Sequence, residues 1–432
     1  MPRRLAIAEP GFEDAFRAVL GDKRETAVDV QADVAAIIAE VRARGDAALI
    51  DYTERFDRLT LTPAQLRIGA DEIAATAARA DADAVAALRL AAGRIEAYHR
   101  RQRPADDRFT DAVGVELGHR WTPVAAAGMY VPGGLASYPS SVLMNAIPAK
   151  VAGVERLVMT VPAPDGALSP LVLAAAGIAG VDEIYRVGGA QAIAALAYGT
   201  KSIAPVDKVV GPGNAWVAAA KRQVFGTVGI DMIAGPSEIL VLADADNDPD
   251  WVAIDLLSQA EHDPVAQAIL VCADAGFADA VTAAVERQLS SLPRAEIART
   301  SWQDFGLVVV LETLAQAPAL IDRLAPEHLL IATADADAMA ARIRNAGAIF
   351  LGPNTPEAIG DYVGGSNHVL PTARSARYAS GLSVLDFMKR TSLLRCDAAA
   401  LAAIGPAAVT LADAEGLPAH ARSVAVRLAR QG

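Results

Sequence analysis

Cysteine is scarce in this sequence, and that scarcity excludes several classes of protein. The 432 residues include only two cysteines, Cys272 and Cys396, which stand far apart in the chain. A disulfide framework and the paired-cysteine metal and redox motifs are therefore excluded, which fits a reducing compartment. Cys272 lies within an apolar run, residues 268–273, so we expect it in a hydrophobic core.

Long uncharged apolar runs and a positive net charge are lacking too. No stretch of about 18 residues is apolar throughout, so no membrane span is expected. The first five residues hold two arginines but precede no apolar segment, so no signal peptide is expected. Lysine and arginine total 39 against 51 acidic residues, a formal charge of −12, which argues against nucleic acid or an anionic membrane as the main partner. The sequence predicts a soluble, cytoplasmic enzyme with two or more domains.

Common catalytic motifs are also missing. The sequence has no Walker A loop, no H-E-x-x-H, no C-x-x-C and no G-x-S-x-G, and Gly235–Glu238 resembles the last only superficially. Three glycine-containing turns do follow predicted strands: Pro132–Gly134, Gly188–Gln191 and Gly211–Asn214. Each precedes a predicted helix, whose first amides can face an anionic or dinucleotide ligand. None is a complete G-x-G-x-x-G. In the third turn Gly211 and Gly213 match this motif, but Trp216 takes the place of its third glycine. Tight turns without a ligand remain the alternative.

Strands and helices alternate along most of the chain, which predicts parallel sheets covered by helices. Residues 31–104 have helical spacing. The first set of predicted strands is Met129–Val131, Leu157–Val161, Ile184–Val187, Lys208–Val210 and Ile239–Leu242. The second set is Ala268–Cys272, Leu307–Leu311, His328–Ala332 and Ala348–Leu351. The predicted fold is α/β, with two Rossmann-like parallel-sheet units, a helical N-terminal region and a helical C-terminal tail.

The predicted domains follow from this alternation. We expect a short polar arm over residues 1–25 and a first α/β domain over 26–128 plus 241–381. A second α/β domain is expected over 129–240. A mostly helical tail is expected over 382–432, with an amphipathic stretch from Pro418 to Arg430.

Histidine is rare, and its distribution indicates a site. Four of the six histidines lie in segments that also carry an acid or an amide, whereas His99 and His119 have ordinary surroundings and are expected at the surface. The segments are Gln259–Asp263, Ala325–His328, Gly360–His368 and Ala414–His420. Imidazole and carboxylate are the ligands that a borderline-soft cation such as zinc prefers. We therefore predict that these segments form one zinc site.

Each segment by itself has a second interpretation. Gln259 and His262 are three residues apart, which places them on one face of a helix as metal ligands or as a plain polar helix end. Glu327 and His328 open a predicted strand, and an acid beside an imidazole suits acid–base chemistry. The glycine-rich loop from Asp361 to His368 can hold a metal or substrate, or can be an ordinary turn.

Taken together, these segments resemble the histidinol dehydrogenase family over roughly residues 30 to 430. The resemblance is carried by Tyr130–Gly134, Tyr138–Val142, Val187–Gln191, Gly211–Asn214, Gly235–Glu238 and the four histidine-containing segments. Two positions depart from the family pattern: Trp216 stands where tyrosine is common, and Pro418 stands where threonine is common. Neither replaces a ligand or a catalytic residue.

The resemblance implies a role for each matching residue. It implies zinc ligation by Gln259, His262, Asp361 and His420, and catalysis by Glu327 and His328. The resemblance further implies substrate contacts for His328, the four zinc ligands, Ser237, His368 and Glu415, with Glu415 and His420 in the tail. Contacts to NAD are implied for Tyr130, Gln191 and Asn214, all of which lie in the second α/β domain.

The resemblance also implies an activity and a partner. The expected reaction is the oxidation of L-histidinol to L-histidine through L-histidinaldehyde, with zinc and NAD as cofactors. The expected assembly is a homodimer with exchanged tails, so that each site would borrow His420 from the neighbouring subunit. The competing interpretations are a related dehydrogenase acting on another alcohol, a zinc hydrolase and a protein that only binds its ligand.

Overall fold

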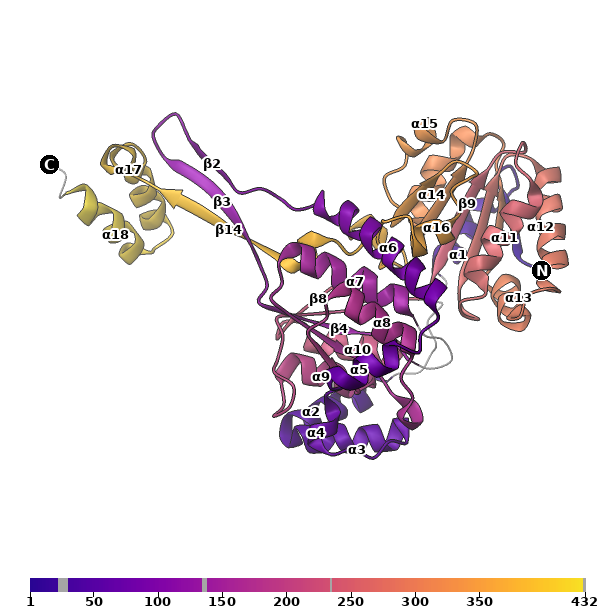
Figure 1. The fold of residues 1–432 in the computed structure, drawn as a ribbon. Helices are drawn as coiled ribbons and strands as arrows, with labels where there is room; N and C mark the ends of the chain where they lie inside the picture. The colour runs from indigo at the N-terminus through magenta and orange to yellow at the C-terminus, as the bar shows by residue number, and fades with distance from the viewer. Residues whose placement is uncertain (22–29, 134–137, 234, 430–432) are drawn as a thin grey trace. The chain divides into compact units, whose positions relative to one another are not determined.

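The structure is a computed structural model of the chain, and it describes residues 1–21, 30–133, 138–233 and 235–429. The chain divides into two compact units: unit 1 comprises Met1–Gln102 and Ala125–Phe387, and unit 2 comprises Arg103–Val124 and Met388–Gly432. Unit 1 contains two parallel sheets flanked by helices, and unit 2 contains an antiparallel sheet and a helix pair (Figure 1). The predicted α/β class, with helices toward both ends of the chain, is confirmed.

The larger sheet of unit 1 has six strands in the order β1-β11-β10-β9-β12-β13, and all neighbours are parallel. Its strands are β1 (Arg3–Ala6), β9 (Glu238–Ala243), β10 (Gln267–Cys272), β11 (Leu307–Val310), β12 (His328–Ala332) and β13 (Ala348–Leu351). The accompanying helices are α1 (Phe12–Gly21), α11 (Pro249–Ala260), α12 (Ala275–Leu289), α13 (Ala295–Asp304), α14 (Ala317–Leu324), α15 (Ala336–Ala340) and α16 (Glu357–Tyr362).

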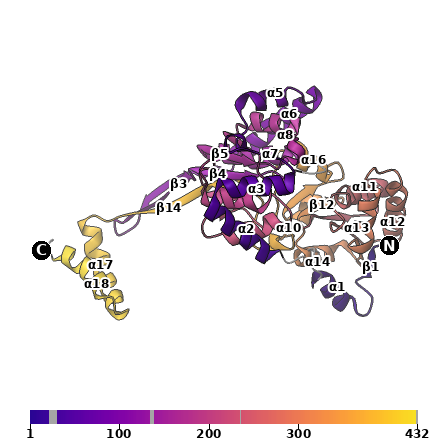
Figure 2. The ribbon, with the colours of Figure 1, turned by 90° about the horizontal axis from the view of Figure 1, so that it is seen from below.

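Both faces of this sheet are buried. In β9, Ile239 and Val241 enter a core shared with α11, α12 and α13, which also contains Cys272 as expected. Leu240 and Leu242 enter a second core, shared with α1 and α14 (Figure 2). Successive side chains of a strand point to opposite faces, so a strand covered on both sides is apolar throughout.

The smaller sheet has five parallel strands in the order β6-β5-β4-β7-β8. They are β4 (Ala126–Tyr130), β5 (Arg156–Thr160), β6 (Glu183–Tyr185), β7 (Lys208–Val210) and β8 (Gly229–Ile230). The connecting helices are α7 (Pro139–Ala152), α8 (Pro170–Ala179), α9 (Gly189–Tyr198) and α10 (Ala215–Val224). The N-terminal helices α2 (Gln31–Arg44), α3 (Asp46–Asp57), α4 (Pro63–Leu66), α5 (Ala70–Ala77) and α6 (Ala82–Arg100) cover this part of unit 1. Short 3-10 turns span Pro164–Gly166, Leu314–Gln316, Ser375–Arg377 and Val384–Phe387.

Unit 2 consists of an antiparallel sheet followed by a helix pair. Its strands are β2 (Asp107–Thr110), β3 (Glu116–Pro123) and β14 (Met388–Arg395), in the order β14-β3-β2. Helices α17 (Ala398–Ala414) and α18 (Pro418–Leu428) pack on each other, with Gly405 of α17 close to Val424 and Leu428. None of the helices in the described ranges is long and apolar enough to cross a membrane.

Several expectations about the chain's organisation are wrong. The first residues are not a polar arm, because β1 pairs with β11 and Phe16 of α1 is fully buried. The run Ile239–Leu242 belongs to the six-stranded sheet as part of β9, not to the first set of strands. The tail holds two helices, as expected for a mostly helical segment, and it also contains the strand β14. Gly134 and Arg430 lie outside the described residues.

His99 was expected at the surface but is fully buried. It continues the buried stripe of α6 after Leu88, Ala91 and Ile95, which recurs every three or four residues. Its Nδ1 lies 2.7 Å from the carbonyl oxygen of Ile95, and its Nε2 lies 3.3 Å from the amide nitrogen of Asn367. His99 is buried because helical spacing places it on the same inner face of α6 as these apolar residues.

Candidate active site

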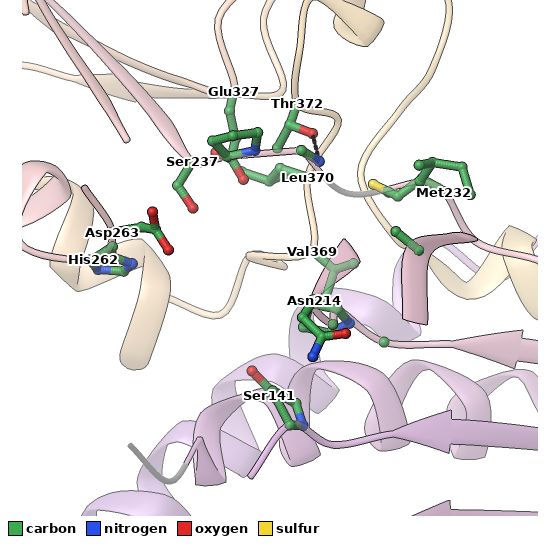
Figure 3. Close-up of a pocket in the computed structure, with 18 of the residues that line it drawn as sticks. Ser141, Asn214, Met232, Ser237, His262, Asp263, Glu327, Val369, Leu370 and Thr372 are labelled. Atoms are coloured by element: carbon green, nitrogen blue, oxygen red, sulfur yellow. Dashed lines mark hydrogen bonds between the residues drawn. The ribbon is translucent and has the colours of Figure 1, made fainter. Parts of the chain in front are cut away.

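A pocket of about 910 Å³ in unit 1 brings most of the predicted site residues together. Eight of them line it: Asn214, Ser237, Gln259, His262, Glu327, His328, Asp361 and His368. Figure 3 shows Ser237, His262 and Glu327 facing the same space as Ser141 and Asn214, which come from other elements. The pocket combines the amino ends of β9 and β12 with the turn at the carboxyl end of β7.

The end of α11 supplies Gln259 and His262. The helix ends at Ala260, but the His262 N–H donates to the Gln259 carbonyl at 3.1 Å, so the chain makes one more turn. Gln259 is 1% exposed, and neither polar atom of its amide has a hydrogen-bond partner in the described part of the chain. Burial lowers the pKa of His262, which leaves a neutral imidazole able to act as a ligand.

Glu327 and His328 are held by the backbone of a single residue, Glu238. The Glu238 N–H donates to Oε2 of Glu327 at 2.9 Å, and the Glu238 carbonyl oxygen lies 2.9 Å from Nδ1 of His328. That carbonyl assigns the neutral ring's proton to Nδ1 and leaves Nε2, which has no hydrogen-bond partner among the described residues, as the basic nitrogen. Because β12 begins at His328, Glu327 lies just before the strand, and both side chains reach the pocket.

Two carboxylates on α16 lie on either side of the His328 ring. Oε1 of Glu357 is 3.2 Å from Nδ1, and Oδ1 of Asp361 is 3.6 Å from Nε2. The sequence interpretation included Asp361 but not Glu357. The signal was present, because residues four apart share one helix face. Ligand atoms of His328, Glu357 and Asp361 lie within 4.8 Å of one another, so this group could itself hold a metal ion.

Burial and mutual charge shift the titration of these groups. Burial raises the pKa of Glu327 to about 8 and that of Glu357 to about 7. Burial also opposes the charged form of His328, but the nearby carboxylates, with Glu357 foremost, outweigh it and raise its pKa well above the usual value. For Asp361, burial opposes ionisation, yet the neighbouring His328 ring, 3.6 Å from its carboxylate, outweighs burial and lowers its pKa. Such clustered, perturbed groups in a pocket are typical of a catalytic site.

His368 is fixed from both sides of its ring. Its Nδ1 lies 3.0 Å from the carbonyl oxygen of Asp361, and its Nε2 lies 3.4 Å from Oγ of Ser141. Burial lowers its pKa, so the neutral ring is favoured. Ser141 was quoted in the sequence only as part of a motif. Its contact with a residue 227 positions away depends on the tertiary fold.

The turn residues of the five-stranded sheet lie at a topological switch point. From β4 the chain proceeds outward through β5 and β6 on one side, and then through β7 and β8 on the other. In parallel sheets, ligands bind in the crevice where the strand order reverses, at the carboxyl ends of the strands. Tyr130 ends β4 and Asn214 follows β7, so these two residues flank that crevice.

The three residues expected to contact a dinucleotide differ in exposure. Asn214 lines the pocket, and its side chain caps α10 by accepting from the N–H groups of Trp216 and Val217. Tyr130 and Gln191 are buried and are not among the pocket's described lining residues. The Tyr130 hydroxyl accepts from the Gly189 N–H at 3.3 Å, which ties β4 to the start of α9. Glu415 and His420 belong to unit 2, in the α17–α18 segment.

Comparisons with known proteins identify the family. A model of the histidinol dehydrogenase family matches residues 21–428. The chain is 64% identical over 431 residues to the histidinol dehydrogenase of Rhodospirillum rubrum, covering 100% of this chain and 99% of that protein. The chain belongs to the histidinol dehydrogenase family. It is therefore an oxidoreductase by family membership.

Further members agree in sequence and in fold. The histidinol dehydrogenase of Ruegeria pomeroyi is 65% identical over 430 residues, covering 100% of this chain and 99% of that protein. The crystal structure of the histidinol dehydrogenase from Elizabethkingia anophelis superimposes with a TM-score of 0.95 at 36% identity, covering 100% of this chain and 98% of that one. The resemblance inferred from the motifs is confirmed, and the architecture described above is that of the histidinol dehydrogenase family.

Proposed function

We propose that this protein oxidises L-histidinol to L-histidine through L-histidinaldehyde, using NAD and zinc, as the last step of histidine biosynthesis in the cytoplasm. The observation that carries the proposal is the convergence of three groups of residues on one pocket. These are the acid–base pair Glu327 and His328, the ligand candidates of α11 and α16, and the turn at the switch point of the five-stranded sheet. A dehydrogenase that uses both zinc and NAD needs all three together.

Gln259 supports the zinc assignment most directly. A buried amide without a hydrogen-bond partner is costly, and a ligand at its oxygen would compensate for this cost. His262 offers a neutral imidazole and Asp361 an ionised carboxylate, which with Gln259 make a mixed nitrogen and oxygen ligand set. We favour Gln259, His262, Asp361 and His420 over the His328–Glu357–Asp361 group. Mutual ion pairing already explains the proximity within that group.

The chain's own residues supply the proton transfers. His328 takes the hydroxyl proton of histidinol at Nε2, because Nδ1 faces the Glu238 carbonyl. Burial raises the pKa of Glu327 to about 8, so its ionised form is a stronger base than an exposed carboxylate and is suited to take a proton from water, so that the aldehyde is hydrated before the second oxidation. Ser237, His368 and the partner's Glu415 would orient the substrate.

The cofactors supply what side chains cannot. Zinc held by Gln259, His262, Asp361 and His420 would serve to orient the imidazole and amine of the substrate. NAD, when bound beside Tyr130, Gln191 and Asn214, accepts the hydride in each oxidation. Positive charge held at Asp361 also favours the neutral form of His328 that a base requires.

The C-terminal helices support a homodimer with exchanged tails. In α17 and α18, only Ala400, Gly405 and Ala421 are buried among the described residues. Leu411, Ile404 and Val426 are exposed. An apolar surface of this kind is typical of a protein–protein interface. We infer that a second copy covers these helices, and that His420 and Glu415 complete the partner's site.

One assay tests the proposed activity. Purified protein with L-histidinol and NAD should form NADH, measured by its near-ultraviolet absorbance, with two NADH formed for each histidine. A related dehydrogenase with another alcohol substrate would leave histidinol unoxidised, and a hydrolase or a binding protein would form no NADH. The stoichiometry separates the complete reaction from one that stops at the aldehyde.

Metal removal tests the zinc assignment. Thorough chelation should abolish NADH formation, and added zinc should restore it. The substitution His262→Asn should lower zinc affinity by at least about tenfold, because the shorter amide cannot replace the imidazole. Bound zinc is measured by elemental analysis after dialysis, with His119→Asn in unit 2 as the matched control. Full turnover by demetallated protein would refute the assignment.

A further inference from the structure

A buried ion pair lies directly beneath the turn at the carboxyl end of β7. Lys221 on α10 pairs with Asp231, which follows β8, and their side chains are only 3% and 1% exposed. Placing two charges out of water costs free energy that their mutual attraction often fails to recover. Stability alone is therefore a poor explanation for the pair, and its other contacts indicate what it does.

Both members of the pair bind the backbone of the same residue, Gly211. The Gly211 N–H donates to Oδ2 of Asp231 at 2.8 Å, and Nζ of Lys221 donates to the Gly211 carbonyl at 2.9 Å. No other side chain in the described ranges forms a hydrogen bond with this backbone. The ion pair therefore satisfies both polar groups of one glycine and fixes the orientation of its two peptide planes.

Gly211 has little freedom to begin with. Its φ of +107° lies in a region that side-chain-bearing residues avoid, and a Cβ atom there would come within 2.2 Å of the Tyr130 carbonyl oxygen. The next residue, Pro212, has no N–H, and Gly213 packs closely on Val217. The path of the turn from Gly211 to Asn214 thus depends on close packing against Tyr130 and Val217 and on the hydrogen bonds from the ion pair.

We propose that Lys221 and Asp231 are positioning residues for the dinucleotide: they hold the Gly211–Asn214 turn in the shape to which NAD binds. The pair, Gly211 and Asn214 all line the pocket, and Tyr130, whose backbone abuts Gly211, ends the neighbouring strand. This inference rests on the proposed NAD-dependent function. Loss of the pair should weaken NAD binding while the histidinol side of the pocket, built on β9, β12, α11 and α16, is unaffected.

The test separates positioning from stability. Lys221→Met and Asp231→Asn should each raise the KM for NAD about tenfold, the effect of losing one charge-assisted hydrogen bond. The KM for histidinol and kcat at saturating NAD should stay within about twofold of the wild type. A calorimetric titration of NAD in the absence of histidinol should show the same loss of affinity.

A double variant removes the charge imbalance that each single variant creates. In Lys221→Met/Asp231→Leu, apolar side chains replace the whole pair, so no unpaired charge remains and part of the melting temperature that the single variants lose should return, although the Gly211 N–H and carbonyl stay without these partners. The KM for NAD should nevertheless stay raised, because Gly211 has lost both partners. If the double variant binds NAD like the wild type, or if both KM values rise equally, the pair has no positioning role.

A second ion pair in the same sheet provides the matched control. Arg156 and Glu183 lie at the amino ends of β5 and β6, and Arg156 likewise donates to two backbone carbonyls, those of Ala204 and Pro205. Glu183→Gln should lower the melting temperature but leave the KM for NAD unchanged. If the wild type binds no NAD, the proposed function and this inference fall together. If the wild type turns over and the Lys221 and Asp231 variants match it, only this inference falls.

Discussion

At the residue scale, the peptide groups of Glu238 orient the two side chains proposed to be catalytic, Glu327 and His328. The N–H of Glu238 binds Glu327 and its carbonyl binds His328, so the two peptide groups that flank the Cα atom of Glu238 at the start of β9 orient both. Glu327 faces the pocket as a buried acid with a raised pKa, and His328 presents Nε2. The two side chains, although adjacent in sequence, thus present different groups to the pocket, which fits the separate tasks proposed for them.

The substitution Glu327→Gln should separate the two oxidations. Glutamine keeps the shape and can still accept from the Glu238 N–H, but it cannot take a proton from water. Oxidation of supplied histidinaldehyde should fall by at least about 100-fold, whereas the first hydride transfer should fall by less than about tenfold. Single-turnover measurements with each substrate give both rates. Equal losses in the two steps would mean that Glu327 and His328 act as one unit.

The stability of α11 should depend on pH through Asp255. Burial raises the pKa of Asp255 from 3.8 to about 6, so the folded state keeps this proton over a range in which the unfolded state loses it. The contribution of Asp255 to the free energy of unfolding is therefore fully present below pH 3.8 and is lost as the pH rises toward 6. Asp255→Asn should be more stable than the wild type at about pH 8, by up to about 3 kcal/mol, and this gain should shrink toward about pH 4.

Urea unfolding at the two pH values measures this difference. Asp250 on the same helix is the control, because hydrogen bonds from Gln288 and Arg287 lower its pKa instead. Asp250→Asn should give no gain in stability at about pH 8. A gain for Asp250→Asn equal to that of Asp255→Asn would point to a general effect of removing negative charge.

At the scale of elements, α16 is pressed against the sheet so closely that only glycine fits at one position. A Cβ atom on Gly360 would lie 2.3 Å from the ring of Phe350, which stacks on the ring of His328 with centroids 6.1 Å apart. The close approach brings Glu357 and Asp361 to either side of His328. The packing of one short helix thus sets the surroundings of His328, the proposed base.

Gly360→Ala should therefore lower both stability and activity. The added methyl group must displace Phe350 or the helix, at a cost of about 1–3 kcal/mol, and should reduce kcat by disturbing His328. Gly177 in α8 is the matched control, because a Cβ there meets nothing within 4 Å. Gly177→Ala should be neutral or stabilising by up to about 1 kcal/mol, with unchanged kcat. Denaturant unfolding and steady-state kinetics on both variants decide between these outcomes, and an unchanged kcat in Gly360→Ala would contradict the role assigned to α16.

At the scale of the whole molecule, the proposed exchange of tails can be tested by complementation. His420→Asn and His328→Asn should each be inactive alone. If tails cross between subunits, a mixed dimer pairs the intact body of one variant with the intact tail of the other. Half of the dimers are mixed under random pairing and each has one complete site, so roughly a quarter of all sites should recover.

The complementation experiment uses co-expressed chains with two different affinity tags. Tandem purification isolates the mixed dimers, and NADH formation measures their activity. Mixed dimers without activity would rule out crossed tails and leave the zinc assignment intact. The two variants mixed without subunit exchange serve as the control, because they form no mixed dimers and should stay inactive.

Much of the fold could be predicted from sequence because its signals are local. The runs His328–Ala332 and Ala348–Leu351 coincide with β12 and β13, since short apolar stretches bounded by turn residues identify buried strands. Histidines beside acids and amides likewise marked four segments. Three of these segments contribute residues to one pocket, namely Gln259, His262, Glu327, His328, Asp361 and His368. Composition and motif were enough here because each ligand or base needs a particular residue type.

Only the tertiary structure decided which elements join and which side chains meet. An apolar run does not specify which strand it will pair with. Long-range pairing therefore decides which sheet contains Ile239–Leu242, and it also places β1 at the edge of that sheet. The Glu238 peptide groups and Ser141 act through contacts between segments distant in sequence, which no local pattern encodes. The sequence by itself determined the chemistry that is available, because chemistry follows residue type. The packing of two sheets and one short helix decided how that chemistry is arranged, because distances between remote segments exist only in the folded chain.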